Sequence, residues 1–283
     1  MRVDFNENKQ FGLIGYPLGH SMSQIIHNEL FKISNIDADY EMIEVAPENL
    51  GKEFEERLKT LNGFNVTIPH KINIIPFLDE LSVKADLFGA VNTVEVREDK
   101  ISGHNTDCSG FLRALEMADI ELGGNVLLCG SGGVSRMLAF ETVLAGADLT
   151  IAVREADLKA ADVIKNEIKE KLGKDAEIIL LTEAQKGYDL IINGTPVGMF
   201  PNVDACPLAE DVVKSAKAVF DVIYNPTQTK LIKYAKEAGI KCSSGLSMLV
   251  WQAAVAEEIW NGVKFSNEDV QKVIEITEKE LEK

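Results

Sequence analysis

The sequence predicts an α/β fold with two domains, an N-terminal α/β domain with a mostly parallel sheet and a Rossmann-type dinucleotide-binding domain. Short apolar runs alternate with amphipathic helical patterns along the chain, which is typical of parallel sheets covered by helices. A glycine-rich turn at residues 130–135 follows one of these runs and opens a helical pattern. The length of 283 residues is enough for two separate hydrophobic cores.

Composition limits the classes of function. Acidic residues number 45 against 29 basic ones, which gives a formal net charge of −16. Such a chain has no basic surface for a nucleic acid or an anionic membrane, although a few local cations suffice to bind a small anion. No apolar run is long enough to span a bilayer, and residues 1–6 lack the apolar core of a signal peptide.

The cysteines and histidines indicate neither a disulfide framework nor a metal site. Four cysteines are scattered without a Cys-x-x-Cys spacing, which predicts reduced thiols in a cytoplasmic protein. The four histidines have no ligand spacing, so we expect no metal ion.

The N-terminal domain begins with a strand at residues 11–16 and a turn rich in glycine and proline. A helix then starts near Ser21 and Ser23. One serine alone would be explained as the N-cap of this helix. Two hydroxyls at this spacing instead suggest an anion site at the helix N-terminus, where the helix dipole favours negative charge.

The next elements complete the first sheet. We expect a strand at 40–45, a helix at 47–61, a strand at 63–68 and a helix at 72–81, which residues 83–87 can continue. The runs 91–96 and 100–104 flank Arg97-Glu98-Asp99 like a hairpin, so an antiparallel edge is expected there.

The segment Asn65–Lys71, Asn-Val-Thr-Ile-Pro-His-Lys, organises the first domain. It ends the strand at 63–68 and places Thr67, His70 and Lys71 at its carboxyl end, where open parallel sheets bind ligands. A lysine at this place can transfer a proton or hold an anion. The alternative is a solvated lysine at the start of the next helix.

Asp107 stands at the end of the first domain, before a helix expected at 110–118. It either caps this helix or serves the site, and the sequence alone supports both equally. We assign residues 1–108 to the first domain, completed by the C-terminal helices at 243–283. Residues 109–242 then form the dinucleotide-binding domain.

The second domain opens with a strand at 125–129, the glycine-rich turn, a helix at 134–145 and a strand at 149–153. Glycines permit the tight turn and let backbone N–H groups approach a pyrophosphate at the helix N-terminus. Ser135 stands at the third glycine position of the usual fingerprint and is small enough for close helix packing.

The strand at 149–153 decides the expected coenzyme. It ends in Val153-Arg154-Glu155. An acidic residue there binds a ribose 2′-hydroxyl, whereas an arginine suits a 2′-phosphate. Arg154 therefore favours NADP, while Glu155 keeps NAD open. The alternative is that the two side chains form a surface ion pair of little consequence.

The remaining segments continue the α/β alternation. Helices are expected at 156–172, 229–238, 245–260 and 267–281, and strands at 177–181, 190–193 and, as the last one, 218–222. The loop 193–199 follows a strand and is expected to line the nicotinamide side of a cleft. Gln252 lies among apolar residues in the helix 245–260, so it needs either solvent or a specific partner.

Short motifs follow one another in a characteristic order along nearly the whole chain. They are Gly15-x-Pro17-x-x-His20-Ser21-x-Ser23 with His27-Asn28, Asn65-Val66-Thr67-x-Pro69-x-Lys71, Gly89-Ala90-Val91-Asn92-Thr93, Asn105-Thr106-Asp107-x-x-Gly110, Gly130-x-Gly132-Gly133, Asn193-x-Thr195-x-x-Gly198-Met199, Asp221-x-x-Tyr224-Asn225-Pro226 and Gly245-Leu246-x-Met248-Leu249-x-x-Gln252. In these motifs the chain resembles the shikimate dehydrogenase family, within the quinate/shikimate dehydrogenase superfamily.

The resemblance implies an enzyme with its active site in a cleft between two domains. The family reduces 3-dehydroshikimate to shikimate with NADPH, in the pathway to chorismate and the aromatic amino acids. The resemblance implies that Lys71 and Asp107 are the catalytic pair. The implied substrate residues are Ser21 and Ser23, for the carboxylate, and Thr67, Asn92, Tyr224 and Gln252, for the rest. The implied coenzyme residues are Gly130, Ser131, Gly132, Gly133 and Val134, for the pyrophosphate, Arg154, for the adenosine phosphate, and Thr195, Val222 and Gly245, on the nicotinamide side.

Three departures from the family pattern matter for the interpretation. Gln24 replaces a frequent proline, and Ser131 a common alanine. Val153 and Glu155 replace the asparagine and threonine that usually flank the arginine, so an NAD-preferring quinate/shikimate dehydrogenase is an alternative. A non-catalytic ligand-sensing relative is a second alternative, which the intact Lys71 opposes. We expect a small-molecule substrate, no nucleic acid, no membrane, and a monomer or homodimer.

Overall fold

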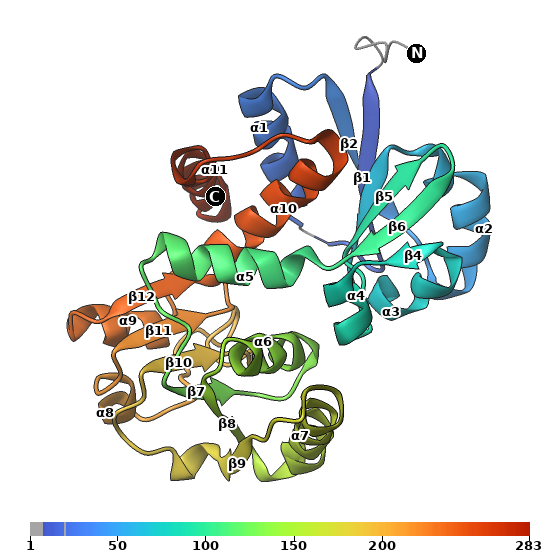
Figure 1. The fold of residues 1–283 in the computed structure, drawn as a ribbon. Coiled ribbons are helices and arrows are strands. Elements are labelled where there is room, and N and C mark those ends of the chain that lie inside the picture. Colours follow the sequence, from blue (N-terminus) through green and yellow to red (C-terminus); the bar gives the residue numbers. More distant parts are fainter. Residues whose placement is uncertain (1–7, 20) are drawn as a thin grey trace. The chain divides into compact units, whose positions relative to one another are not determined.

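The chain divides into two compact units, each built on a six-stranded sheet (Figure 1). The computed structural model describes residues 8–19 and 21–283. Unit 1 comprises Met1–Gly110 and Val250–Lys279, and unit 2 comprises Phe111–Leu249 and Glu280–Lys283. The divisions fall within helices α5 (Thr106–Met117) and α10 (Gly245–Asn261) and in the last turn of α11 (Asn267–Leu281).

The sheet of unit 1 has the strand order β2-β1-β3-β5-β6-β4. Its strands are β1 (Lys9–Gly15), β2 (Ala38–Glu44), β3 (Gly63–Val66), β4 (Glu80–Leu81), β5 (Thr93–Arg97) and β6 (Lys100–His104). Strand β1 runs parallel to β2 and β3, and β4 runs parallel to β6. The hairpin of β5 and β6 is antiparallel, as predicted, but the short strand β4 lies outside it at the edge of the sheet.

The helices expected at 47–61 and 72–81 are replaced by shorter helical segments in unit 1. The helical segments of unit 1 are α1 (Ser23–Ser34), α2 (Leu50–Glu56), α3 (His70–Asn73), α4 (Val83–Phe88) and α11 (Asn267–Leu281), with 3₁₀ turns η1 (Pro47–Asn49), η2 (Leu58–Thr60) and η3 (Ile75–Phe77). The helix expected at 72–81 is wrong, because Pro76 has no N–H to donate and disfavours a helical residue before it. Helix α4 starts anew, with the Ser82 hydroxyl accepting from the Ala85 N–H at 3.3 Å.

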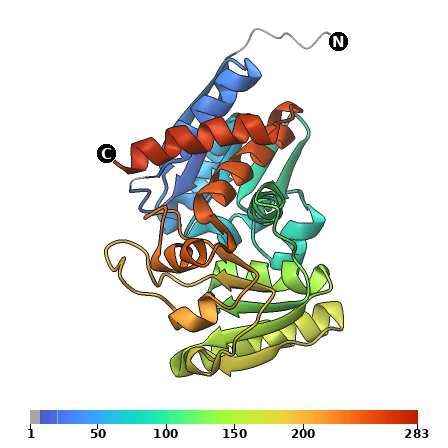
Figure 2. The same ribbon diagram turned by 90° about the vertical axis from the view of Figure 1, so that its left-hand side faces the viewer.

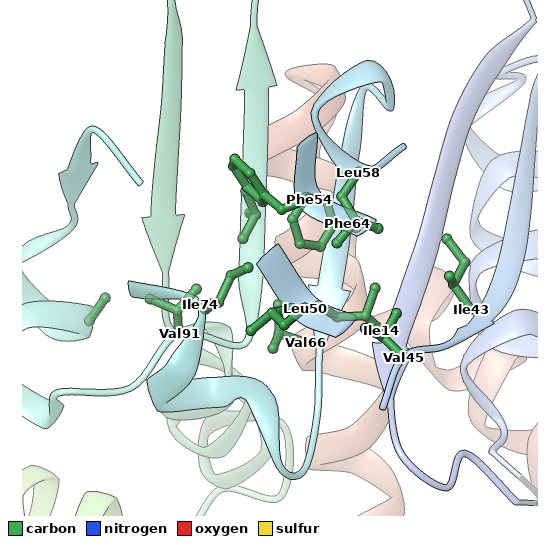
Figure 3. Packing of buried hydrophobic residues seen from close by; sticks show 12 residues of the cluster. Ile14, Ile43, Val45, Leu50, Phe54, Leu58, Phe64, Val66, Ile74 and Val91 are labelled. Carbon is green, nitrogen blue, oxygen red and sulfur yellow. The ribbon is translucent and has the colours of Figure 1, made fainter. Parts of the chain in front are cut away.

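The two faces of this sheet carry separate apolar clusters. Phe11 and Leu13 of β1 pack with Phe31 of α1 and Trp260 of α10. Ile14 belongs to a second cluster, with residues of β2, α2 and β3 (Figure 3). Successive side chains of a strand point to opposite faces, so β1 contributes to both clusters.

The sheet of unit 2 is entirely parallel and has the order β12-β11-β10-β7-β8-β9. Its strands are β7 (Asn125–Cys129), β8 (Asp148–Val153), β9 (Glu177–Leu180), β10 (Leu190–Asn193), β11 (Ala218–Asp221) and β12 (Lys241–Ser244). The order reverses between β7 and β10, which is the arrangement of a Rossmann-type fold, so the predicted fold class is confirmed. Strand β12 was missed because Lys241-Cys242-Ser243-Ser244 carries no apolar run, and backbone pairing with β11 forms it.

Helices follow the strands of unit 2 in alternation. They are α6 (Gly133–Leu144), α7 (Leu158–Leu172), α8 (Glu210–Val213) and α9 (Lys230–Glu237), with 3₁₀ turns η4 (Glu155–Asp157) and η5 (Leu181–Glu183). Helices α6 and α7 contact β7, β8 and β9, while α9 contacts β11 and β12 (Figures 1 and 2). Within the described part of the chain, no helix has both the length and the apolar character needed to cross a membrane.

Candidate active site

Lys71 and Asp107 form the centre of the site in unit 1. Strand β3 ends at Val66, the chain turns at Pro69, and Lys71 lies on the short helix α3. Its Nζ donates a hydrogen bond to Oδ2 of Asp107 at 2.6 Å. The side chains are 32 % and 22 % exposed, so the pair is fixed yet still open to solvent or a ligand.

Asn92 completes the environment of the carboxylate. Its Nδ2 donates to Oδ1 of Asp107 at 2.9 Å, so both oxygens of Asp107 are bound. Asp107 lies in the first turn of α5, while the side chain of Asn105 accepts the Cys108 N–H at 3.4 Å. Asn105 therefore makes the capping contact at this helix end, and the carboxylate of Asp107 is directed to Lys71 and Asn92 instead.

The two N-terminal serines lie next to each other at the start of α1. Ser21 Oγ donates to Ser23 Oγ at 3.1 Å and accepts the Ser23 N–H at 3.2 Å. The N-cap residue of α1 is Met22, which makes no side-chain capping bond, while the Ser21 hydroxyl binds the N–H of the first helical residue. The paired hydroxyls thus lie at a helix N-terminus, as the sequence predicts. His20, in the same motif, lies outside the described residues.

The other expected substrate residues come from several elements. Thr67 follows β3, and its N–H donates to the Ile14 carbonyl oxygen at 2.9 Å. Gln252 lies on α10 in the part that belongs to unit 1 and is 9 % exposed. Tyr224 lies after β11 in unit 2 and is partly buried. Of the residues expected in the site, Lys71, Asn92 and Asp107 are joined by direct hydrogen bonds.

In unit 2 the glycine turn connects β7 to the N-terminus of α6. Gly130 has a φ of +104°, a conformation that side chains other than glycine rarely adopt. A Cβ at Gly132 or Gly133 would meet no other atom within 4 Å, so the backbone N–H groups here can be approached closely. Backbone donors at the start of a 12-residue helix suit a phosphate group.

Ser135 has a definite structural reason to replace the third glycine. It is fully buried, and its hydroxyl donates to the Gly194 carbonyl oxygen at 3.1 Å. A Cβ on Gly194 would lie only 2.4 Å from this hydroxyl oxygen. The serine therefore ties α6 to the loop after β10, at the point where the strand order reverses.

The loops after β10 and β11 are joined by a buried carboxyl group. Asn193 Nδ2 donates to Oδ1 of Asp221 at 3.0 Å, and the Thr195 hydroxyl donates to Oδ1 of Asn193 at 2.6 Å. Burial raises the pKa of Asp221 to about 6. Next to it, a Cβ on Gly245 would lie 1.9 Å from the Val222 carbonyl oxygen, so only glycine fits there.

Arg154 lies directly after β8 and is 74 % exposed. Its Nε donates to Oδ2 of Asp157 at 2.7 Å. The ion pair suggested for Arg154 and Glu155 is therefore made with Asp157 instead. The rest of the exposed guanidinium can bind a phosphate in a planar, bidentate way.

Comparisons with known proteins find relatives that match most of the chain. Residues 13–94 match the shikimate dehydrogenase substrate binding domain, and residues 245–275 match the shikimate 5′-dehydrogenase C-terminal domain. The chain is 41 % identical to "Shikimate dehydrogenase (NADP(+))" of Methanocaldococcus jannaschii, over 91 % of this chain and 93 % of that protein. The chain belongs to the shikimate dehydrogenase family.

Solved structures of the shikimate dehydrogenase family have the same fold. A shikimate dehydrogenase in complex with NADP⁺ superposes with a TM-score of 0.86 at 38 % identity, covering 95 % of each chain. The shikimate 5-dehydrogenase of Thermus thermophilus in complex with NADP(H) and shikimate has a TM-score of 0.84 at 30 % identity, covering 95 % of this chain and 99 % of that one.

The sequence analysis assigned no role to several polar residues in and near the shikimate dehydrogenase motifs. Tyr40, Thr93 and Thr106 lie in the hydrogen-bond network of Asn92 or of its neighbour Asn65. A signal was present in the sequence, because a polar residue inside a buried strand requires a partner, and Asn65 stands between Phe64 and Val66. Among residues 8–19 and 21–283, no group of three or more histidine, cysteine, aspartate or glutamate side chains is arranged to hold a metal ion.

Proposed function

We propose that the chain is an NADP-dependent shikimate dehydrogenase, which reversibly reduces 3-dehydroshikimate to shikimate on the route to chorismate and the aromatic amino acids. The observation that carries the proposal is the Lys71–Asp107 pair, with its 2.6 Å hydrogen bond, in a chain 41 % identical to a named shikimate dehydrogenase. A lysine fixed by a carboxylate suits proton transfer at a carbonyl oxygen.

Lys71 carries the proton in this mechanism. NADPH supplies the hydride. As negative charge builds on the substrate oxygen, the Lys71 ammonium donates a proton to it, and in the reverse direction the neutral amine accepts the hydroxyl proton. Asp107 holds Nζ in place, and Asn92 holds the second oxygen of Asp107, so the ammonium has a defined orientation before the substrate binds.

The substrate residues are assigned from the resemblance to the family, and the chemistry of the two serines supports the assignment. The adjacent hydroxyls of Ser21 and Ser23 suit the carboxylate of shikimate, because a hydroxyl group can donate a hydrogen bond and both lie at a helix N-terminus. Thr67, Asn92, Gln252 and Tyr224 are assigned to the ring hydroxyls. We place the substrate-binding domain at residues 1–108 with 243–283 and the NADP-binding domain at 109–242.

The residues of unit 2 fit a dinucleotide. The open backbone at Gly132 and Gly133, at the N-terminus of α6, suits a pyrophosphate. This assignment covers Gly130, Ser131, Gly132, Gly133 and Val134. The exposed guanidinium of Arg154 suits the 2′-phosphate of NADP, and Thr195, Val222 and Gly245 are assigned to the nicotinamide side.

Steady-state kinetics of Lys71→Ala test the proposal. We expect wild-type protein to oxidise shikimate with NADP⁺, and the variant to lose at least about a hundredfold in kcat with a modest change in KM. Lys52→Ala, which removes an exposed lysine of the same unit, is the matched control and should leave both constants unchanged. A near-normal kcat in Lys71→Ala would remove this residue from the mechanism.

Rates with alternative substrates and coenzymes separate the competing functions. We expect the highest kcat/KM for NADP⁺ with shikimate. A higher value for NAD⁺ with quinate would instead identify a quinate/shikimate dehydrogenase. Tight shikimate binding without turnover would indicate a ligand-sensing relative.

The proposal also covers the cellular location and the oligomeric state of the enzyme. No disulfide joins the four cysteines, all of which lie in the described part of the chain, in keeping with a reducing, cytoplasmic location. We infer a monomer or homodimer acting on a small molecule, and sedimentation would distinguish the two states.

A further inference from the structure

A chain of hydrogen bonds in unit 1 leads from Tyr40, on β2, to the catalytic pair. The Tyr40 hydroxyl donates to Oδ1 of Asn65, on β3, at 2.7 Å. This first half of the chain of hydrogen bonds joins strands β2 and β3.

The second half leads from Asn65 to the carboxylate. Asn65 Nδ2 donates to Thr93 Oγ1 at 3.0 Å, and Thr93 Oγ1 donates to Oδ1 of Asn92 at 3.1 Å. Asn92 Nδ2 then donates to Asp107 at 2.9 Å. Tyr40, Asn65, Thr93 and Asn92 are each at most 4 % exposed, so water cannot replace these bonds without a change in structure.

Two backbone groups fix the orientation of the side-chain amides in this chain of hydrogen bonds. The Asn92 carbonyl oxygen, 3.3 Å from Asn65 Nδ2, can only accept, so Oδ1 of Asn65 must face Tyr40. The Thr106 N–H, 2.6 Å from Oδ1 of Asn92, can only donate, so Nδ2 of Asn92 must face Asp107. The amide donors of Asn65 and Asn92 therefore point toward the carboxylate, and such aligned bonds polarise one another. Between them, the Thr93 hydroxyl lies 3.1 Å from Oδ1 of Asn92 and 3.0 Å from Oγ1 of Thr106.

Tyr40 is itself held rigidly at the head of this chain. Its ring stacks on His27 with a centroid distance of 4.1 Å and an interplanar angle of 9°. His27 Nδ1 lies 2.6 Å from Oε1 of the buried Glu257. Burial and the nearby Glu257 hold the pKa of Tyr40 well above its usual value, so the phenol keeps the proton that it donates to Asn65.

We propose that Tyr40 is a positioning residue for the dehydrogenase reaction, acting through Asn65, Thr93 and Asn92 on the orientation of the carboxylate that holds Lys71. The inference rests on the proposed function. A tilt of the carboxylate displaces the ammonium from the substrate oxygen, and displacements of this kind lower the rate of the chemical step more than substrate affinity.

Two substitutions that remove single hydroxyls test the proposal. Tyr40→Phe removes the first donor, and Thr93→Val removes a later one without touching Tyr40. In shikimate oxidation we expect each to lower kcat about fivefold, the worth of one net hydrogen bond, with KM changed less than about twofold. The kcat of the double variant should also fall only about fivefold, because either substitution interrupts the same chain of hydrogen bonds. Independent effects would instead multiply to about a 25-fold loss in kcat.

Thr277→Val is the matched control. Thr277 is a fully buried residue of α11, and its hydroxyl donates to the Val273 carbonyl oxygen at 2.7 Å. Its removal should lower the melting temperature and leave kcat unchanged. A kcat loss in Tyr40→Phe that multiplies with that of Thr93→Val, or a wild-type kcat in Tyr40→Phe, would overturn the proposal.

Two further outcomes keep the test decisive. If Tyr40→Phe does not fold, a wild-type kcat in Thr93→Val overturns the positioning role by itself. If the wild-type protein does not oxidise shikimate at all, the proposed function fails. If it does and the variants behave like Thr277→Val, only the role of Tyr40 fails.

Discussion

Asp221→Asn should remove a pH dependence of stability that the buried carboxyl group creates. Asp221 is fully buried at the end of β11, and its Oδ1 accepts from Asn193 Nδ2 at 3.0 Å and from the Ile223 N–H at 3.1 Å. Oδ2 accepts from the Thr229 hydroxyl. Burial outweighs these bonds and raises the pKa from its ordinary 3.8 to about 6.

The sign and size of the effect follow from proton linkage. Between pH 3.8 and about 6 the folded protein holds a proton at Asp221 that the unfolded chain has lost. The contribution to the free energy of unfolding is therefore complete below about pH 4 and lost as the pH rises through 6. A shift of about two units corresponds to roughly 3 kcal/mol.

Urea unfolding followed by far-UV circular dichroism, at several pH values from 4 to 7.5, measures this effect. As the pH rises from 4 to 7.5, the free energy of unfolding of Asp221→Asn should increase by roughly 3 kcal/mol relative to that of wild type. The contributions of the other titrating groups cancel in this difference. Asp189→Asn is the control without a pH trend in this range, since Lys217 lowers the pKa of Asp189 below its ordinary 3.8 and the contribution of that carboxylate to stability changes only below about pH 4. A difference between Asp221→Asn and wild type that stays constant with pH would refute the reasoning.

Two other predictions concern the coenzyme residues. In Gly245→Ala the new Cβ would lie 1.9 Å from the Val222 carbonyl oxygen, so we expect a loss of about 3 kcal/mol or more in the free energy of unfolding, measured in urea, together with weaker NADPH binding. Wild-type stability would contradict this. Arg154→Ala should raise the KM for NADPH about ten- to a hundredfold and leave that for NADH nearly unchanged, because one charge-assisted phosphate contact is lost. An equal rise in the KM for NADPH and for NADH in steady-state assays would show that Arg154 does not bind the 2′-phosphate.

Much of the fold was predictable because its signals are local. Strands β7 and β10 and helix α11 occupy the residues expected from apolar runs and helical periodicity. The glycine turn was found because its position between a strand and a helix is itself a sequence feature. The Lys71–Asp107 pair was predicted through the family resemblance, and the 2.6 Å hydrogen bond agrees with it.

The errors arose where local signals were weak or conflicting. Strand β12 has polar residues, and β4 has only two residues, so neither shows an apolar run. Both exist because a neighbouring strand supplies hydrogen-bond partners for their backbone. The helix expected at 72–81 followed the apolar periodicity but ignored Pro76, which interrupts the hydrogen-bond ladder.

Sequence by itself determined the class of the fold, the order of its elements and the motifs of the shikimate dehydrogenase family. Tertiary structure decided which polar residues act together. Asn65 and Thr93, 28 residues apart, lie opposite each other only because β3 and β5 pair in one antiparallel register. The raised pKa of Asp221 likewise depends on burial by elements distant in the chain. Hydrogen bonding and desolvation depend on distance in space, which a linear sequence does not state.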